Sequence, residues 1–283
     1  MTTSLPELDE LAARVHAAER AAQDDPSRRL VWIDALLDLA EGLRRCGRAD
    51  QAIAAVDEAV ALLGTTQAHL RHAGALDVRA SLLRSLGRSE EALESAERAL
   101  ELVAGLASRD PAAHLLPLAQ LTHNLGRCYR QAQRFDRAAA AFEQAVGGYR
   151  ILAQAHSEAH GGALVEVMSD HALALAQVGE LERAHALASA TLELAERSPG
   201  WGLLPLITGI RQLLADLALD LGRPREALEH LLAGMRLLDA AIAERLPGAT
   251  GAAAKLAASL RELCEAQGFS MPEELAAKLG SCR

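Results

Sequence analysis

Five segments of the chain repeat the same arrangement of small residues, and this repetition constrains the fold more than any other feature. An alanine recurs at spacings of 40, 46, 46 and 43 residues. These fixed alanines are Ala52, Ala92, Ala138, Ala184 and Ala227. Twelve residues before them lies a first-helix small column: Ala40, Ala80, Gly126, Ala172 and Ala215. A period of this length indicates a stacked array in which each repeat buries its apolar face against its neighbours.

The residue type that recurs at each position of these repeats has a physical explanation in a helix hairpin. Small residues let two helices pack with close axes, and the position seven after the fixed alanine is also small: Ala59, Ala99, Ala145, Thr191 and Gly234. Five residues before the fixed alanine, we expect a left-handed cap that ends the first helix. The residues there are Gly47, Gly87, Gln133, Gly179 and Gly222. The chain has 60 Ala and 51 Leu but only 2% aromatic residues, which favours helices over sheets.

This order of small residue, glycine and two alanines resembles the tetratricopeptide repeat (TPR), and residues 124–145 resemble it most closely. The resemblance covers about residues 30–245 and implies an all-α, right-handed superhelical solenoid of about five helix hairpins. Repeats of 40–46 residues exceed the usual length of about 34, so the second helices are expected to be long. Such long repeats are similar to those of kinesin light chains and of actinobacterial regulators. A HEAT or armadillo array has a compatible period and remains an alternative.

We expect one continuous domain over residues 1–283 with a capping segment at each end. Residues 1–25 would form an N-terminal capping helix, 26–245 the five repeats, and 246–283 two C-terminal capping helices, giving thirteen helices in all. Capping boxes are expected at Ser4–Glu7 and Ser270–Glu273, the second before a helix at 271–280. Asp25-Pro26 and Asp110-Pro111 are expected to start helices, with the aspartate as N-cap and the proline in the first turn.

Composition argues against several classes of function. The chain carries 38 acidic and 29 basic residues, for a net charge of −9, whereas nucleic-acid-binding proteins usually show a basic excess together with stacking aromatics. No run of 18 apolar residues is present, and the N-terminus has no signal-peptide pattern, so we expect a cytoplasmic protein that binds neither nucleic acid nor membrane. The four cysteines are widely spaced and are expected to be free thiols.

Candidate binding residues follow from the resemblance, which implies that the first helix of each hairpin lines a concave surface. Four residues past the first-helix small column stand Arg44, Arg84 and Arg130. The other candidates flank this arginine column or lie at related positions: Arg45, His123, Asn124, Arg127, Asp170 and Asp216. Asn124 matches a position at which some family members hold a ligand. We therefore predict a groove that is basic at its N-terminal end and acidic at its C-terminal end. The alternative is that these are solvated helix faces with internal ion pairs.

Metal binding and catalysis have weaker support in the sequence. His156 and His160 have the spacing of a helical zinc-ligand pair, but no third ligand is evident, and the repeat spacing places His160 in a turn between repeats. No phosphate loop, nucleophile elbow or dinucleotide-binding motif is present. Trp201 could anchor a partner or link adjacent repeats. We predict no catalytic residue, no metal and no cofactor.

The leading interpretation is a non-catalytic interaction module, a scaffold or sensor in a regulatory system, that binds a partly acidic protein or peptide in its groove. The alternative is a small-molecule-binding or catalytic helical-repeat protein from a biosynthetic pathway. A closed apolar pocket with converging His123, Arg127 and Tyr129 would favour that alternative. The chain is expected to be a monomer or a homodimer.

Overall fold

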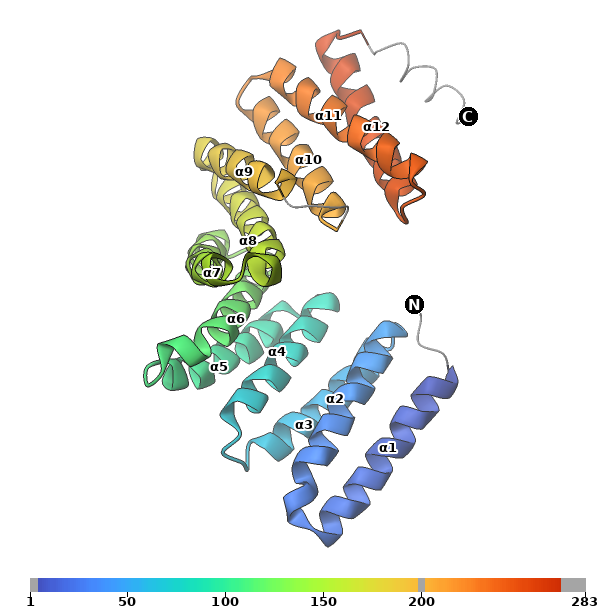
Figure 1. Ribbon diagram of the computed structural model, residues 1–283, viewed down its shortest axis with the longest axis vertical. Coiled ribbons are helices and arrows are strands. Elements are labelled where there is room, and N and C mark those ends of the chain that lie inside the picture. Colours follow the sequence, from blue (N-terminus) through green and yellow to red (C-terminus); the bar gives the residue numbers. More distant parts are fainter. Residues whose placement is uncertain (1–4, 198–201, 271–283) are drawn as a thin grey trace. The chain divides into compact units, whose positions relative to one another are not determined.

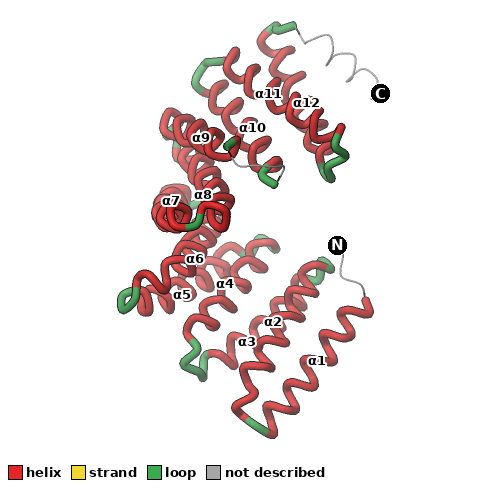
Figure 2. Tube along the Cα trace, in the orientation of Figure 1, coloured by secondary structure: helices red, strands yellow, loops and turns green. Residues whose placement is uncertain are grey.

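The computed structural model describes residues 5–197 and 202–270, which form twelve α-helices and one 3₁₀ turn, with no strand among them (Figures 1 and 2). The predicted all-α class is therefore confirmed. The helices are α1 (Leu5–Asp24), α2 (Arg29–Arg45), α3 (Ala49–Leu63), α4 (His69–Ser85), α5 (Ser89–Ala107), α6 (Pro111–Gln131), α7 (Phe135–Ala155), α8 (Ser157–Val178), α9 (Leu181–Glu196), α10 (Leu204–Asp220), α11 (Pro224–Ala243) and α12 (Ala249–Gln267). The expected helix at 271–280 lies outside the described residues, as do Ser4, Glu273 and Trp201.

The chain divides into two compact units, Met1–Gly148 and Tyr149–Arg283, with the boundary inside α7. In unit 1, each helix from α1 to α6 packs against the next one in sequence, and α4 also contacts α6. In unit 2, the same sequential packing runs from α8 to α12, and α10 also contacts both α8 and α12. No helix in the described part of the chain combines the length and the apolar character that a bilayer span requires. The single domain predicted over the whole chain stays a prediction.

The small residues of the repeat lie at the closest helix contacts. All five fixed alanines are 0% exposed, and the alanines of the first-helix small column are at most 1% exposed. A Cβ atom on Gly126 of α6 would lie 2.6 Å from Cε1 of Phe142 in α7, and one on Gly234 would lie 2.6 Å from Cδ2 of Leu256. These positions are therefore small because the neighbouring helix leaves no room for a larger side chain.

The expected left-handed caps are present at all five positions. Gly47, Gly87, Gly179 and Gly222 have φ between 72° and 92°. Gln133, which replaces glycine in the third repeat, adopts the same region with φ 58°. The repeat therefore imposes this backbone conformation even where a Cβ atom makes it costly.

The two expected Asp-Pro helix starts behave differently. The side chain of Asp110 accepts a hydrogen bond from the backbone N–H of Ala113 at 3.1 Å and caps α6, as predicted. Asp25 instead accepts from the backbone N–H of Ser27 at 3.0 Å and begins only the 3₁₀ turn Pro26–Arg28. The predicted N-cap and first-turn proline are therefore confirmed at Asp25-Pro26, but the helix that they begin is a 3₁₀ turn, and α2 follows it directly at Arg29.

Successive hairpins are linked by ion pairs at equivalent repeat positions. Arg134 Nη2 lies 2.8 Å from Glu90 Oε2, and Arg223 Nη2 lies 2.8 Å from Glu182 Oε1. Each arginine stands four residues before a fixed alanine, and each glutamate stands two before the preceding one. Their side chains are partly exposed, so each pair contributes only about 0–1 kcal/mol, but the recurrence shows that both junctions share one packing geometry.

Candidate binding surface

The predicted arginine column lies at the C-terminal ends of three first helices in unit 1. Arg44, Arg84 and Arg130 are each the next-to-last residue of their helix, in α2, α4 and α6 respectively. The shared position follows from the repeat, because the glycine or Gln133 cap ends each helix three or so residues later. A cation near a helix C-terminus is also favoured by the helix dipole, so the position alone does not require a ligand.

The three arginines differ in their partners. Arg44 donates from Nε and Nη2 to the two carboxylate oxygens of Glu41, at 2.7 and 2.8 Å, and Arg45 Nε lies 3.6 Å from the same carboxylate. The hydrogen bond from Arg44 lowers the pKa of Glu41. Arg84 is half-buried, and among the described residues no carboxylate lies within 4.0 Å of its guanidinium group. Arg84 thus differs from Arg44 in having no carboxylate within ion-pair distance among the described residues, while its charge acts on Asp77 of the same helix.

Asn124 links α6 to α4 through Asp77. Its Nδ2 atom donates to both carboxylate oxygens of Asp77, at 2.9 and 2.8 Å. A second link is the hydrogen bond from Gln131 Nε2 to the backbone carbonyl of Arg84, at 2.8 Å. Burial raises the pKa of Asp77, while the Asn124 hydrogen bond and the charge of Arg84 act in the opposite direction. The amide that the sequence assigned to ligand binding is therefore used to position neighbouring helices.

The other candidates on α6 have different neighbours. His123 is 5% exposed, and its ring meets Phe142 of α7 edge-on with the centroids 5.7 Å apart. Tyr129 turns toward α5, where its hydroxyl donates to Glu97 Oε1 at 2.8 Å and Arg137 lies 5.9 Å above its ring. Arg127 is half-buried on the same helix. A closed small-molecule pocket formed by the three residues stays an alternative prediction.

The predicted acidic residues lie in unit 2. Asp170 is half-buried on α8, and Asp216 is exposed on α10, where Gln212 Nε2 donates to its Oδ1 at 2.8 Å. Partial desolvation raises the pKa of Asp216, and the charge of Asp220 adds to this effect. The basic and acidic candidates therefore belong to different units, and a single groove that joins them stays a prediction.

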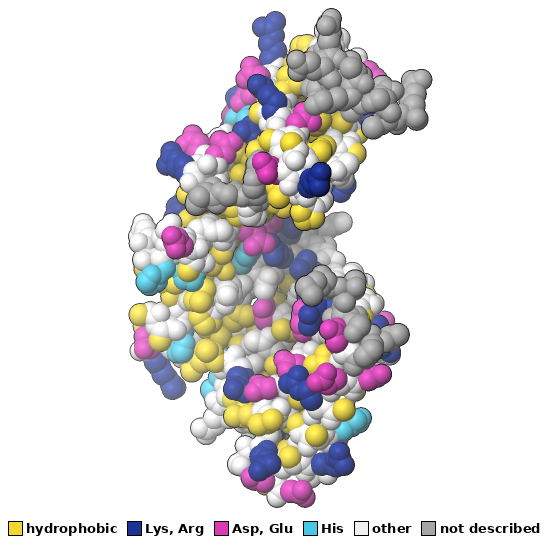
Figure 3. Space-filling model, turned by 45° about the vertical axis from the view of Figure 1, so that its right-hand side comes forward, with side chains coloured by type: hydrophobic (Ala, Val, Ile, Leu, Met, Phe, Trp, Pro, Cys, Tyr) yellow, Lys and Arg dark blue, Asp and Glu magenta, His cyan; other side chains and the backbone are white. Residues whose placement is uncertain are grey.

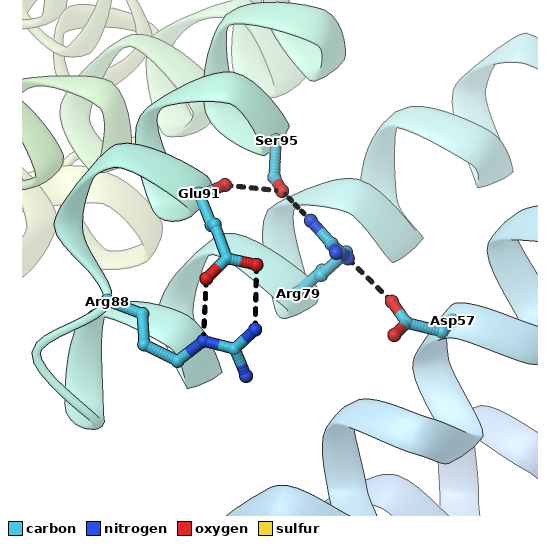
Figure 4. Close-up of polar contacts among 5 residues, drawn as sticks. All are labelled: Asp57, Arg79, Arg88, Glu91 and Ser95. Carbon is cyan, nitrogen blue, oxygen red and sulfur yellow. Dashed lines mark hydrogen bonds and ion pairs between the residues drawn. The ribbon is translucent and has the colours of Figure 1, made fainter.

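Sequence analysis missed a half-buried arginine in unit 1. Arg79 of α4 is 22% exposed; its Nε lies 2.6 Å from Asp57 Oδ1, and its Nη1 donates to Ser95 Oγ at 2.6 Å (Figure 4). Ser95 in turn donates to the Glu91 carbonyl, and the Glu91 carboxylate accepts two 2.7 Å hydrogen bonds from Arg88. The sequence did carry a signal for Arg79. The residue before the first-helix small column is leucine in three of the five repeats, whereas the second repeat has this arginine there.

Hollows large enough for a ligand occur in both units. The hollow in unit 1 has a volume of about 700 Å³ and is lined by Arg79 and by charged residues of α3 and α5. The hollow in unit 2 measures about 590 Å³ and is mostly apolar, between α10 and α12, with Leu204, Leu238 and Leu256 in its wall. On the face of unit 1 that Figure 3 shows, basic and acidic side chains are interleaved, so that face is not dominated by one sign of charge.

His156 and His160, whose spacing is that of a helical zinc-ligand pair, do not lie on one helical face. His156 precedes α8 as its N-cap residue, with φ −143°, and only His160 is helical. The expectation that His160 lies in a turn between repeats is wrong, because α8 already begins at Ser157. A helix start at Ser157 therefore removes the i, i+4 geometry on which the pair depended.

Comparison with known proteins agrees with this architecture. Residues 73–102 and 121–151 match two family models of the tetratricopeptide repeat. The chain contains tetratricopeptide repeats. The second TPR segment includes residues 124–145, which the sequence singled out. No curated protein sequence matches the chain.

Solved TPR structures resemble the chain at low identity. BtubC (BKLC) from P. vanneervenii is 18% identical with a TM-score of 0.68, covering 82% of this chain and 90% of its own. A putative kinesin light chain from Podosopora anserina with TPR-like repeats is 19% identical with a TM-score of 0.62, covering 75% and 96%. A third structure is a Signal Transduction ATPase with Numerous Domains (STAND) protein with a tetratricopeptide repeat sensor, from Pyrococcus horikoshii. It is 14% identical with a TM-score of 0.65, and the match covers 86% of this chain and 36% of that protein. These similarities establish the TPR solenoid fold.

Proposed function

We propose that this chain is a non-catalytic protein-interaction module that binds a partly acidic peptide or protein segment on the first helices of its TPR hairpins. In this proposal the module serves as a scaffold or sensor in a regulatory system. The observation that carries it is Arg84, a half-buried guanidinium group in the middle of an arginine column, with no carboxylate within ion-pair distance among the described residues.

The chemistry of Arg84 suits a carboxylate ligand. A guanidinium group offers a planar fork of donors that binds a carboxylate through two parallel hydrogen bonds. Arg44 satisfies this fork within its own helix through Glu41, whereas Arg84 has no such partner. The links from Asn124 to Asp77 and from Gln131 to the Arg84 carbonyl hold α4 and α6 in place around it. A ligand carboxylate would therefore meet a preorganised cation, which lowers the cost of binding.

The similar structures support an interaction role by analogy. One of them is described as a STAND protein with a tetratricopeptide repeat sensor, and another as a putative kinesin light chain. Both share only the fold with this chain, so they support the class of function rather than a particular partner.

Charge reversal at Arg84 tests the proposal. Fluorescence anisotropy would measure binding of a labelled peptide library of acidic segments, with free or amidated C-termini, to the parent protein and to Arg84→Glu. We expect Arg84→Glu to weaken the peptides that the parent binds at least tenfold, about 1.4 kcal/mol, and binding by the parent to weaken as salt increases. Thermal unfolding of both proteins is measured in parallel, because Arg84 is half-buried and its charge also acts on Asp77.

Arg98→Glu is the matched control, because it makes the same change in net charge on the exposed face of α5, a second helix. Equal binding by Arg84→Glu and the parent would exclude the first-helix face as the recognition surface. An equal loss in Arg98→Glu would show that only overall charge matters. If Arg84→Glu unfolds, Arg84 is a structural residue and the proposal fails.

A second candidate function, small-molecule binding, is favoured by the apolar hollow in unit 2. Gly209 lines this hollow, and a Cβ atom added there would meet nothing within 4 Å. Leucine at this position would therefore fill the space without disturbing α10. Binding of an environment-sensitive apolar dye by the parent, and its loss in Gly209→Leu, would support this candidate; an unchanged dye signal would exclude it.

A further inference from the structure

Two histidines and a glutamate meet between second helices of unit 2. His185 lies on α9, and Glu226 and His230 lie on α11. One potential ligand atom from each residue lies within 4.8 Å of the others, and His185 Nε2 is 2.9 Å from Glu226 Oε1. Glu226 and His230 are four residues apart in one helix, so they share a face, and His185 reaches them from the preceding hairpin.

The repeat pattern shows that both histidines are exceptions at their positions. His185 stands one residue past a fixed alanine, where the other four repeats have apolar residues: Ile53, Leu93, Ala139 and Leu228. His230 stands three past the next fixed alanine, where the others have Ala55, Ser95, Ala141 and Leu187. Small or apolar residues are therefore sufficient for helix packing at these two positions, and packing does not require a histidine at either one. The two imidazoles occur only where successive hairpins bring these positions together.

The cluster is shielded from solvent but accessible. The His185 side chain is 13% exposed and that of Glu226 34%, so an ion could reach the three groups while most of the His185 ring stays covered.

The charged neighbours are themselves largely compensated. Arg211 forms an ion pair with Glu196, and Arg223 pairs with Glu182 at 2.8 Å while lying 3.8 Å from Glu226 Oε2. Glu229 adds a further negative charge near His230. A bound cation would therefore not face an uncompensated cluster of guanidinium groups.

We propose that His185, Glu226 and His230 form a binding site for a divalent transition-metal ion, and that zinc fits it best. Two imidazole nitrogens and one carboxylate oxygen are a common zinc ligand set, with water completing the tetrahedron. In a tetrahedral zinc site with bonds of about 2.0–2.1 Å, neighbouring ligand atoms lie about 3.3 Å apart. Small rotations of three side chains close the present separations to that value. The ion would join α9 to α11, and so tie the fourth hairpin to the fifth.

Metal titration of the full, tag-free chain tests this site. Isothermal titration calorimetry with zinc chloride should show one ion per chain for the parent, and His185→Gln/His230→Gln should weaken binding at least tenfold. Glu226→Gln provides a second variant that keeps both imidazoles. Zinc should raise the melting temperature of the parent but not of the double variant, because an ion that binds only the folded state stabilises it.

His156→Gln/His160→Gln is the matched control, because it removes two histidines at the start of α8 and leaves the cluster intact. Its affinity should equal that of the parent. Cobalt(II) bound to the parent should show the visible bands of a four-coordinate ion without thiolate charge-transfer absorption, which would exclude the cysteines as ligands. The proposal fails if the parent binds no zinc below about 100 μM, if the control loses as much affinity as His185→Gln/His230→Gln, or if both cluster variants bind like the parent.

Discussion

Gly126→Ala tests the close packing of α6 on α7, which positions Asn124 and Arg130. The new Cβ atom would lie 2.6 Å from Cε1, 2.7 Å from Cδ1 and 3.1 Å from Cζ of Phe142. Carbon atoms in contact are normally about 3.5–4.0 Å apart, so the ring or the helix must move by about 1 Å. Phe142 is 0% exposed, which leaves the ring no free space.

We expect Gly126→Ala to lower the free energy of unfolding by about 1–2 kcal/mol. Overpacking a core costs about 1–3 kcal/mol, and the better helix propensity of alanine returns up to about 1 kcal/mol. Urea unfolding followed by circular dichroism at 222 nm measures the difference. The matched control is Gly74→Ala in α4, where an added Cβ atom meets nothing within 4 Å and should stabilise by about 0.5–1 kcal/mol.

Phe142→Leu should relieve the clash. The double variant Gly126→Ala/Phe142→Leu should be more stable than the sum of the two single effects by at least about 1 kcal/mol, because residues in contact are not additive. If Gly126→Ala is as stable as Gly74→Ala, the small column does not mark close helix contacts. The binding positions, which are counted from that column, would then lose their basis.

Three further results are expected. Ala80→Leu and Ala172→Leu should each lower the free energy of unfolding by about 1–3 kcal/mol, because both alanines are at most 1% exposed and leave no room for a larger side chain. Urea unfolding measures the change, and unchanged stability in both variants would contradict the close helix packing. Burial raises the folded-state pKa of Asp77 above its unfolded-state pKa. Between these two pKa values the folded chain binds more protons than the unfolded chain, so the free energy of unfolding falls as the pH rises through that range. Asp77→Asn should therefore gain stability relative to the parent as the pH rises above the unfolded-state pKa of about 3.9, and a difference that is constant with pH would refute this. Burial raises the pKa of Cys128 to about 11, so iodoacetamide at pH 8 should leave it unmodified in the folded chain, as mass spectrometry of peptides can show.

The fold was predictable because its decisive contacts involve residues whose identity the packing restricts. A buried alanine such as Ala92, or a left-handed cap such as Gly87, leaves a trace at the same place in every repeat. Even Gln133, which departs from that pattern, is placed correctly by its neighbours, because the hairpin dictates its backbone. Asp25 was placed correctly as an N-cap, but its pattern does not distinguish an α-helix from a short 3₁₀ turn.

The candidate site was predictable only in its positions. The repeat places Arg44 and Arg84 at equivalent points, but side-chain partners depend on residues that differ between repeats, such as Glu41 beside Arg44. The contact of Asn124 with Asp77 joins α6 to α4 through two residues that are 47 positions apart in the sequence, a separation that no local pattern reveals. Arg79 left a sequence signal that only a comparison of every repeat position reveals.

The recurring ion pairs between hairpins have a consequence for how such a chain can lengthen. The hairpin α4–α5 carries both partners of the junction: Arg88 is attracted to Asp50 of the preceding hairpin, and Glu90 pairs with Arg134 of the following one. A tandem duplication of this hairpin would therefore place Glu90 of one copy opposite Arg88 of the next. The new junction would already have complementary charges when the duplication arises. Unequal recombination could therefore add a repeat without a compensating mutation at the junction.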